Sequence, residues 1–126
     1  MNHLLIVAAG GAVGAMLRHL SNLAALRLFG SGLPWGTFFV NVTGSLLMGL
    51  FIGWLARRSG GTSNELRLLL ATGFLGGFTT FSAFSLDFAT LWRDGAAGAA
   101  IGYVLASVLF SLVAIFAGLW LMRIAA

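Results

Sequence analysis

The chain has 126 residues, of which 60% are hydrophobic and only 8% are charged. Soluble globular domains carry about 25% charged residues, so a soluble core of this composition would leave a large apolar surface facing water. The composition therefore excludes an ordinary soluble domain and favours an integral membrane protein. The formal net charge of +4 comes from arginines spread along the chain, without the basic stripe that nucleic-acid binding requires. The absence of cysteine excludes disulfides and cysteine-ligated metals.

Glycine, proline and charged residues divide the chain into four apolar stretches, at residues 3–29, 35–56, 66–92 and 96–122. A transmembrane helix needs about 20 residues to cross roughly 30 Å of hydrocarbon, so each stretch is long enough to span. The first stretch lacks a basic start and stays apolar through Leu28, which argues against a cleaved signal peptide. The short connections make sequential helices antiparallel neighbours. We expect an all-α membrane protein with one four-helix transmembrane domain over residues 1–126.

Glycines recur four residues apart in every stretch: Gly10 and Gly14, Gly49 and Gly53, Gly73 and Gly77, and Gly98 and Gly102. This spacing lets helix backbones approach closely in lipid. Packing within one chain and packing between chains both explain the pattern. Four helices are few for enclosing a pore, which favours an oligomer.

The arginines specify the orientation in the membrane poorly. An even number of spans puts both termini and the second connection on one side, with four arginines: Arg57, Arg58, Arg67 and Arg123. The other side carries Arg27 and Arg93, and Arg18 lies in the first span nearer that end. Since arginine-rich loops prefer the cytoplasm, this weak bias predicts dual topology, in which the chain inserts both ways and pairs antiparallel.

Polar residues inside spans face a partner helix or a water-filled path, because they are costly in lipid. The second span carries four of them: Thr37, Asn41, Thr43 and Ser45. The spacing puts Asn41 on the same helix face as Thr37. A hydrogen bond from Asn41 to a neighbouring helix competes with a role in a path.

The third span contains adjacent glycines, Gly76 and Gly77, followed by two threonines. Both features lower helix propensity, so we predict a helix broken at mid-membrane, with a continuous helix as the alternative. Freed carbonyls at such a break suit a cation. Phe81 and Phe84 follow on one helix face, flanked by Ser82. Their positive ring edges attract a small anion, although packing against lipid or protein is the more ordinary explanation for phenylalanine.

The fourth span carries hydroxyls four residues apart, at Tyr103, Ser107 and Ser111. Such a row either donates hydrogen bonds along a path or binds another helix. Arg18 and Asp87 are the charged groups nearest membrane depth; we expect Arg18 to anchor backbone at a vestibule and Asp87 to pair with an arginine. No nucleophile and base pattern is present, so we expect no enzyme.

Three motifs together carry a resemblance to a known family. They are GGAVGAMLR at residues 10–18, GTFFVNVTG at residues 36–44 and GFLGGFTTFSAFS at residues 73–85. The chain resembles the Fluc (CrcB) fluoride channels of microbes through its first three spans in order, and the fourth agrees in length and polar spacing. The third motif is the specific one, because the glycine and arginine motif alone is weak.

The resemblance implies an antiparallel, dual-topology homodimer in a bacterial inner membrane, with two fluoride pathways and a structural sodium ion. It implies that the carbonyls of Gly76 and Thr79 hold the sodium. By the same resemblance the pathway residues are Asn41, Phe81, Phe84, Ser82, Tyr103, Ser107 and Ser111. Asp87 stands where the family often has glutamate, which leaves its role open.

The resemblance then implies passive conduction of fluoride, in which we expect donors such as Asn41, Ser107 and Ser111 to replace the water of the ion. The main alternative is a small proton-coupled multidrug exporter, which needs an acid deep in a span. The first span has no acid, and Asp87 lies toward the end of the third. A non-transporting assembly subunit is the second alternative.

Overall fold

The computed structural model describes residues 2–58, 60 and 64–125 of the chain. Its helices are α1 (Asn2–Phe29), α2 (Trp35–Ala56), α3 (Asn64–Arg67), the π-helix η1 (Leu68–Leu75), α4 (Gly76–Phe78), α5 (Phe81–Arg93) and α6 (Ala97–Ile124). The third predicted span comprises α3, η1, α4 and α5. The prediction of four long apolar helices is confirmed, and their ends differ from the predicted ends by at most two residues.

Local sequence explains where the spans end. The N–H of Gly30 donates to the carbonyl of Leu26 at 3.0 Å, and the positive φ of Gly30, 77°, ends α1. Gly95 does the same after α5 with a φ of 83°. Only glycine reaches this region without strain, so both turns depend on it. Pro34 immediately precedes α2, where a missing N–H costs little.

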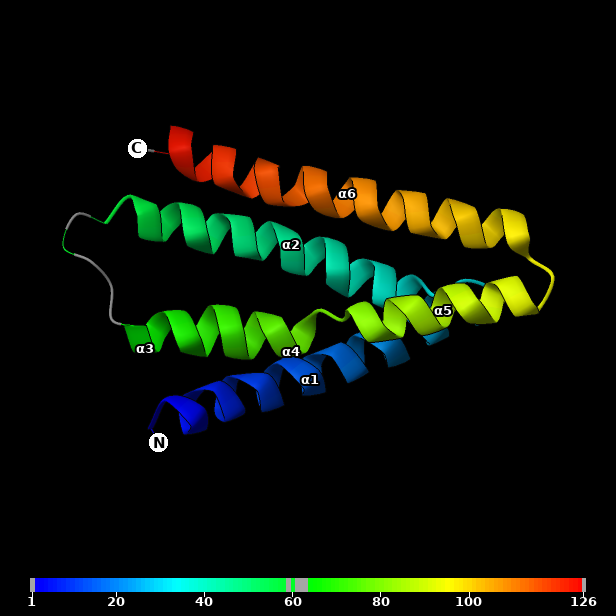
Figure 1. The fold of residues 1–126 in the computed structure, drawn as a ribbon, viewed down its shortest axis with the longest axis horizontal. Helices are drawn as coiled ribbons and strands as arrows, with labels where there is room; N and C mark the ends of the chain where they lie inside the picture. The colour runs from blue at the N-terminus through cyan, green and yellow to red at the C-terminus, as the bar shows by residue number, and fades with distance from the viewer. Residues whose placement is uncertain (1, 59, 61–63, 126) are drawn as a thin grey trace.

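The start of α1, the end of α2, the start of α3 and the end of α6 lie at one end of the bundle, as Figure 1 shows. α2 packs along α6, and α1 packs along η1 and α4. The third span changes its neighbour part way along, because α5 packs on α6 instead. The helices are therefore arranged as two pairs, α1 with the first half of the third span and α2 with α6; the two helices of each pair run parallel, and the third span joins the pairs.

Close glycine contacts hold these pairs together. A Cβ at Gly14 would collide with the carbonyl of Phe74, and one at Gly77 would lie 2.5 Å from the carbonyl of Gly11. α2 and α6 meet in the same way, where a Cβ at Gly118 would lie 2.5 Å from the carbonyl of Leu46. Three of the four glycine pairs thus pack within the chain. Among the described residues nothing lies within 4 Å of a Cβ built at Gly98 or Gly102, so this last pair faces outward.

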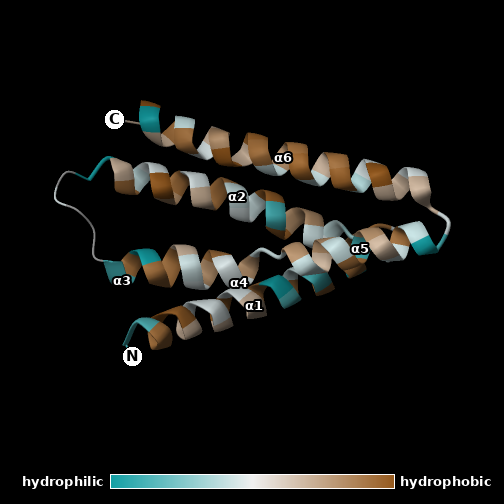
Figure 2. Ribbon diagram, viewed as in Figure 1, coloured by the Kyte–Doolittle hydropathy of each residue, from teal (hydrophilic) through white to brown (hydrophobic). Residues whose placement is uncertain are grey.

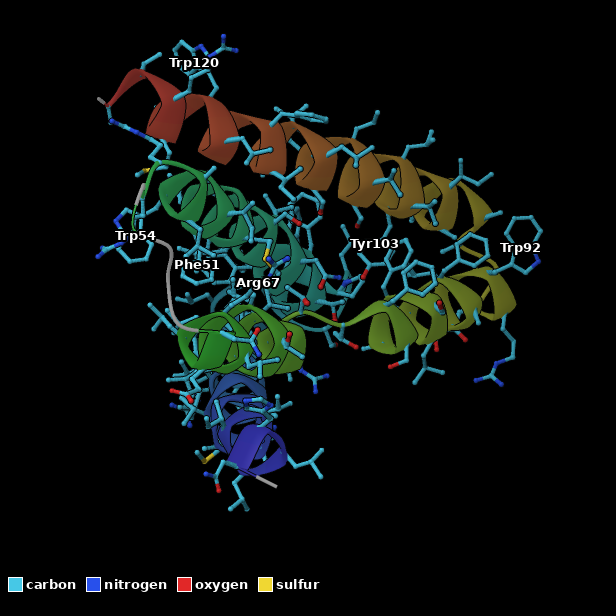
Figure 3. All side chains as sticks on the ribbon, turned by 60° about the vertical axis from the view of Figure 1, so that its left-hand side comes forward. Phe51, Trp54, Arg67, Trp92, Tyr103 and Trp120 are labelled. Carbon is cyan, nitrogen blue, oxygen red and sulfur yellow. The ribbon has the colours of Figure 1, made fainter. Side chains whose placement is uncertain are left out.

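The surface is apolar along the whole bundle, and Figure 2 shows hydrophobic residues on every long helix. Large side chains such as Leu4, Phe116 and Trp120 are exposed. Trp54 and Trp120 lie at the end of the bundle that carries the termini, and Trp92 lies at the other end (Figure 3). Tryptophan favours the membrane interface, so these positions agree with four helices that are long and apolar enough to cross a membrane.

Candidate functional site

The third span has two extended residues between α4 and α5. Thr79 has φ −86° and ψ 159°, and Thr80 has φ −155° and ψ 122°. In a continuous helix the N–H of Thr80 would donate to the carbonyl of Gly76, but here it donates to Oδ1 of Asn41 at 2.8 Å. Nδ2 of Asn41 donates in return to the carbonyl of Thr80 at 3.0 Å. One amide side chain of α2 therefore satisfies both backbone groups of Thr80.

Glycine makes this approach of α2 to the third span possible. A Cβ at Gly44 would collide with Cγ2 of Thr79, so the threonine methyl occupies the space of the missing side chain. The position of Asn41, three residues earlier on α2, places its amide beside Thr80. The contact between α2 and the extended residues therefore depends on both Gly44 and Asn41.

Side chains also cap the two helix ends at the extended residues. Oγ1 of Thr80 accepts from the N–H of Ala83 at 3.2 Å, which begins α5, and it shares a 3.3 Å hydrogen bond with Oγ of Ser82. At the end of α4, Nε of Arg18 donates to the carbonyl of Gly77 at 3.1 Å. A cation suits this position, because the carbonyl end of a helix carries partial negative charge. Arg18 thus binds backbone in this structure.

A cavity of about 320 Å³ lies beside the extended residues, between α2, α5 and α6. α2 contributes Asn41, Gly44, Ser45 and Met48, and α6 contributes Ser107, Val108, Ser111 and Ile115. The third span contributes Thr79, Thr80, Phe81 and Phe84. The structure therefore brings together five of the seven predicted pathway residues in one cavity: Asn41, Phe81, Phe84, Ser107 and Ser111. Ser82 and Tyr103 are not among the residues that line it.

Ser107 is the most informative residue of the cavity wall. Its side chain is only 5% exposed, and its hydroxyl has no hydrogen-bond partner among the described residues. Buried polar groups usually have partners, because an unsatisfied one costs about 1–3 kcal/mol. Ser107 therefore carries an unused hydrogen-bond donor at the wall of the cavity.

The aromatic residues lie at one side of the cavity in a short series. The ring centroids of Phe81 and Phe84 are 5.5 Å apart, and those of Phe84 and Tyr103 are 5.3 Å apart, both tilted. Phe84 and Tyr103 are each 8% exposed, whereas Phe81 is 77% exposed. The buried pair is fixed by packing, while Phe81 has little cover from its own chain.

Tyr103 connects this region to Asp87. Its hydroxyl donates to Oδ2 of Asp87 at 3.0 Å, and Figure 3 shows its side chain in the space between α6 and α5. The partner of Asp87 in the described part of the chain is thus a tyrosine and not the expected arginine, because the topology brings α5 against α6. The spacing of residues within one span did not identify this partner.

Asp87 also lines a second cavity, of about 260 Å³. Asn22, Thr37 and the α1–α2 connection from Gly30 to Trp35 contribute to its wall. Thr37 therefore lies at this second cavity and Asn41 at the first, although the two share a helix face. The spacing of residues in the sequence predicts neither Asn22 nor this cavity, because Asn22 lies on α1 and comes near Thr37 through the packing of α1 on α2.

Metal ligation by acidic or imidazole side chains finds no support in residues 2–58, 60 and 64–125. No group of three or more His, Asp or Glu side chains gathers there. The oxygens that remain for a cation are backbone carbonyls and hydroxyls at the extended residues.

The fold and the site define a class of protein: a small bundle of four candidate membrane spans with a cavity between them whose mainly apolar wall carries several hydroxyls and an amide. The family described as "CrcB-like protein, Camphor Resistance (CrcB)" matches residues 5–119, and the chain belongs to this family. Similar relatives are the "Fluoride-specific ion channel FluC" of Mesorhizobium japonicum, 61% identical over 98% of both chains, and that of Chelativorans sp., 60% identical over the same shares. The protein of the same name from Hyphomonas neptunium is 57% identical over 98% of this chain and 97% of its own.

Proposed function

We propose that the chain is a fluoride-specific ion channel that conducts fluoride passively out of the cell across the inner membrane. The observation that carries this proposal is the buried, unpartnered hydroxyl of Ser107 in the wall of the 320 Å³ cavity. The printed names of relatives about 60% identical over nearly the whole chain support it. A channel needs no catalytic group, and the protein is not an enzyme.

Fluoride is small and strongly hydrated, so a selective path must replace its water with donors. Ser107 and Ser111 offer two hydroxyls from α6. Asn41 has two N–H groups on Nδ2, of which one donates to Thr80, so the other is left for an ion. Phe81 and Phe84 add ring edges, which are electropositive. Together these groups surround a small anion without any basic side chain in the cavity.

Tyr103 extends the route toward the second cavity. It lies one helical turn before Ser107, and its hydroxyl reaches Asp87 in the wall of that cavity. The row of Tyr103, Ser107 and Ser111 then forms a continuous series of hydroxyls between the two cavities. The carboxylate of Asp87 accepts the hydrogen bond from the Tyr103 hydroxyl and so holds the tyrosine ring in this position.

An antiparallel homodimer completes each pathway. Phe81 is 77% exposed beside the cavity, and a second copy of the chain provides the cover that this ring lacks. The outward-facing Gly98 and Gly102 allow close approach of another helix in lipid. The near balance of arginines between the two ends supports insertion in both orientations. Two copies related by a two-fold axis carry two equivalent pathways.

A structural sodium ion at the two-fold axis fits the extended residues. The usual helical donor to the carbonyl of Gly76 is the N–H of Thr80, which binds Asn41 instead. The usual donor to the carbonyl of Thr79 is the N–H of Ala83, which binds Oγ1 of Thr80. Gly76 is exposed, so its carbonyl oxygen is able to face a second copy. Bound sodium supplies fixed positive potential near the pathways.

Liposome efflux tests the proposal. The purified chain is reconstituted in vesicles loaded with potassium fluoride, valinomycin is added, and a fluoride electrode follows release beside a chloride control. Rapid fluoride release with negligible chloride release is expected. Ser107→Ala slows the release, while Ser21→Ala, whose parent hydroxyl already donates to the carbonyl of Leu17 at 2.8 Å, leaves it unchanged. Absence of fluoride release from a well-folded dimer overturns the proposal and returns proton-coupled efflux of organic cations to first place.

A further inference from the structure

Ser45 of α2 lies in the wall of the same cavity as the two serines of α6. We propose that the Ser45 hydroxyl is a third donor to the ion in this cavity and that it contributes to the selection of fluoride over larger halides. The inference rests on the proposed function. It adds a residue of α2 to a wall whose other serine hydroxyls belong to α6.

A comparison of the serines within the helices supports this role. A helical serine commonly donates to the carbonyl four residues earlier. Ser21 does so to Leu17 at 2.8 Å and Ser85 to Phe81 at 3.0 Å, and neither lines the 320 Å³ cavity. The hydroxyl of Ser45 has no such bond among the described residues, like that of Ser107.

Ser111 follows the same rule, since its hydroxyl also forms no hydrogen bond within residues 2–58, 60 and 64–125. The three serines of the cavity wall thus have no hydrogen bond among the described residues, whereas Ser82, at the start of α5 and outside the wall, bonds the hydroxyl of Thr80. A serine that only filled space on a helix would gain by bonding to the backbone. The common feature of the three is the cavity that they face.

Close contacts of two glycines of α2, one before and one after Ser45, hold this part of the helix in place. Gly44, the preceding residue, abuts the Thr79 methyl, and Gly49, one turn later, abuts the carbonyl of Ile115 on α6. α2 is therefore in contact with the third span on one side of Ser45 and with α6 on the other. The hydroxyl projects from a helix segment that has little freedom to move, which is the condition for a pre-organised donor.

The same contacts limit the width of the cavity. A Cβ at Gly118 would lie 2.7 Å from the N–H nitrogen of Leu50, so α2 and α6 already touch through backbone. An ion that binds Ser45 on one wall and Ser107 or Ser111 on the other must fit the separation that this contact sets. Packed backbones resist a change of spacing, so a larger halide is poorly accommodated between the donors of the two walls.

The first test measures efflux from vesicles for Ser45→Ala, Ser45→Thr and the matched control Ser21→Ala. Loss of a hydrogen bond to a charged group costs roughly tenfold or more, so Ser45→Ala is expected to slow fluoride release about tenfold and to lower the fluoride to chloride ratio. Ser45→Thr keeps a hydroxyl and restores most of the release. Release from Ser45→Ala within twofold of the parent chain overturns the inference.

The second test separates a role in ion binding from a role in helix packing. The chain has no cysteine, so Ser45→Cys places a single thiol in the cavity. Its modification by methyl methanethiosulfonate, followed by mass, is expected to be slower in fluoride than in an equal concentration of chloride, whereas Ser21→Cys reacts equally in both. Equal rates at Ser45→Cys in the two salts overturn the inference, even if Ser45→Ala slows release.

The parent chain in the same vesicles distinguishes the two proposals. If the parent chain releases fluoride and the Ser45 variants release it at the same rate, the channel proposal stands and the proposed role of Ser45 is wrong. If the parent chain itself releases no fluoride, both are overturned.

Discussion

The amide side chain of Asn41 exchanges two hydrogen bonds with the backbone of Thr80, at 2.8 Å and 3.0 Å, across 39 residues of sequence. This exchange replaces the helical bonds that an extended residue cannot make. It also leaves one N–H of Asn41 without a bond to Thr80, in a residue that lines the cavity, so the structural role is compatible with the proposed donor role. The two explanations for Asn41 that the sequence left open are therefore compatible.

Asn41→Asp is expected to slow fluoride efflux by roughly 10–100-fold. The carboxylate keeps an acceptor for the N–H of Thr80 but loses the donor to its carbonyl, and leaving a buried group unpaired costs about 1–3 kcal/mol. The new negative charge also repels an anion in the cavity. The rate of fluoride efflux is measured in vesicles that contain dimers isolated by size exclusion. Thr43→Val, on the same helix but outside the wall of the cavity, is the control, and equal rates for both variants would contradict the assignment.

Phe81→Ile is expected to slow fluoride release about tenfold while the protein stays folded. Phe81 is 77% exposed, so its ring contributes little to the packing of its own chain, and an aromatic edge contact is worth about 0.5–1.5 kcal/mol. Phe116, which is 68% exposed on α6 and outside the 320 Å³ cavity, offers a matched control in Phe116→Ile. If both substitutions leave efflux unchanged, ring edges play no part in conduction.

Gly14→Ala is expected to destabilise the bundle by about 1–3 kcal/mol, because its Cβ meets the backbone of Phe74 and Phe78. Gly11→Ala on the same helix is the control, because its Cβ would make only an ordinary contact of 3.8 Å with the carbonyl oxygen of Gly73, and alanine favours a helix by about 1 kcal/mol over glycine. Thermal melting in detergent compares the two variants. A Gly14→Ala protein as stable as the parent chain would show that α1 can move away from the third span at little cost.

Removal of sodium is expected to lower the thermal midpoint of the dimer by several degrees and to slow fluoride efflux. An ion that binds the folded state alone stabilises it by about 2.7 kcal/mol when present at a hundredfold excess over its Kd. Restoring sodium reverses both changes, and potassium at the same concentration does not. The same midpoint with and without sodium would rule out a structural ion at the carbonyls of Gly76 and Thr79.

Reporter fusions at the carboxyl terminus are expected to show it on both sides of the membrane. The arginine bias that fixes orientation is weak, since the four arginines at one end are opposed by Arg27, Arg93 and Arg18 toward the other. Adding two lysines to the connection after Phe29 should shift the distribution strongly to one side. A single location for the parent chain would exclude dual topology.

The sequence by itself determined the number, length and approximate ends of the four long helices. Lipid imposes apolar runs of about 20 residues, and glycine and proline mark the turns between them, so local signals suffice. It also identified the serines of α6 and the phenylalanines of α5 as a set of interest, because helical spacing shows which residues share a face.

Only the tertiary structure decided what each face meets. Spacing does not specify how far a helix is rotated against its neighbour, and the partners here are distant in sequence: Asn41 binds Thr80, and Tyr103 binds Asp87. For the same reason glycine pairs of identical spacing differ, since Gly10 and Gly14 pack on the third span whereas Gly98 and Gly102 face outward. Ser45 lies in the cavity wall between the close contacts of Gly44 with the Thr79 methyl and of Gly49 with the Ile115 carbonyl, which depend on the shape of the partner surfaces and not on the spacing within α2.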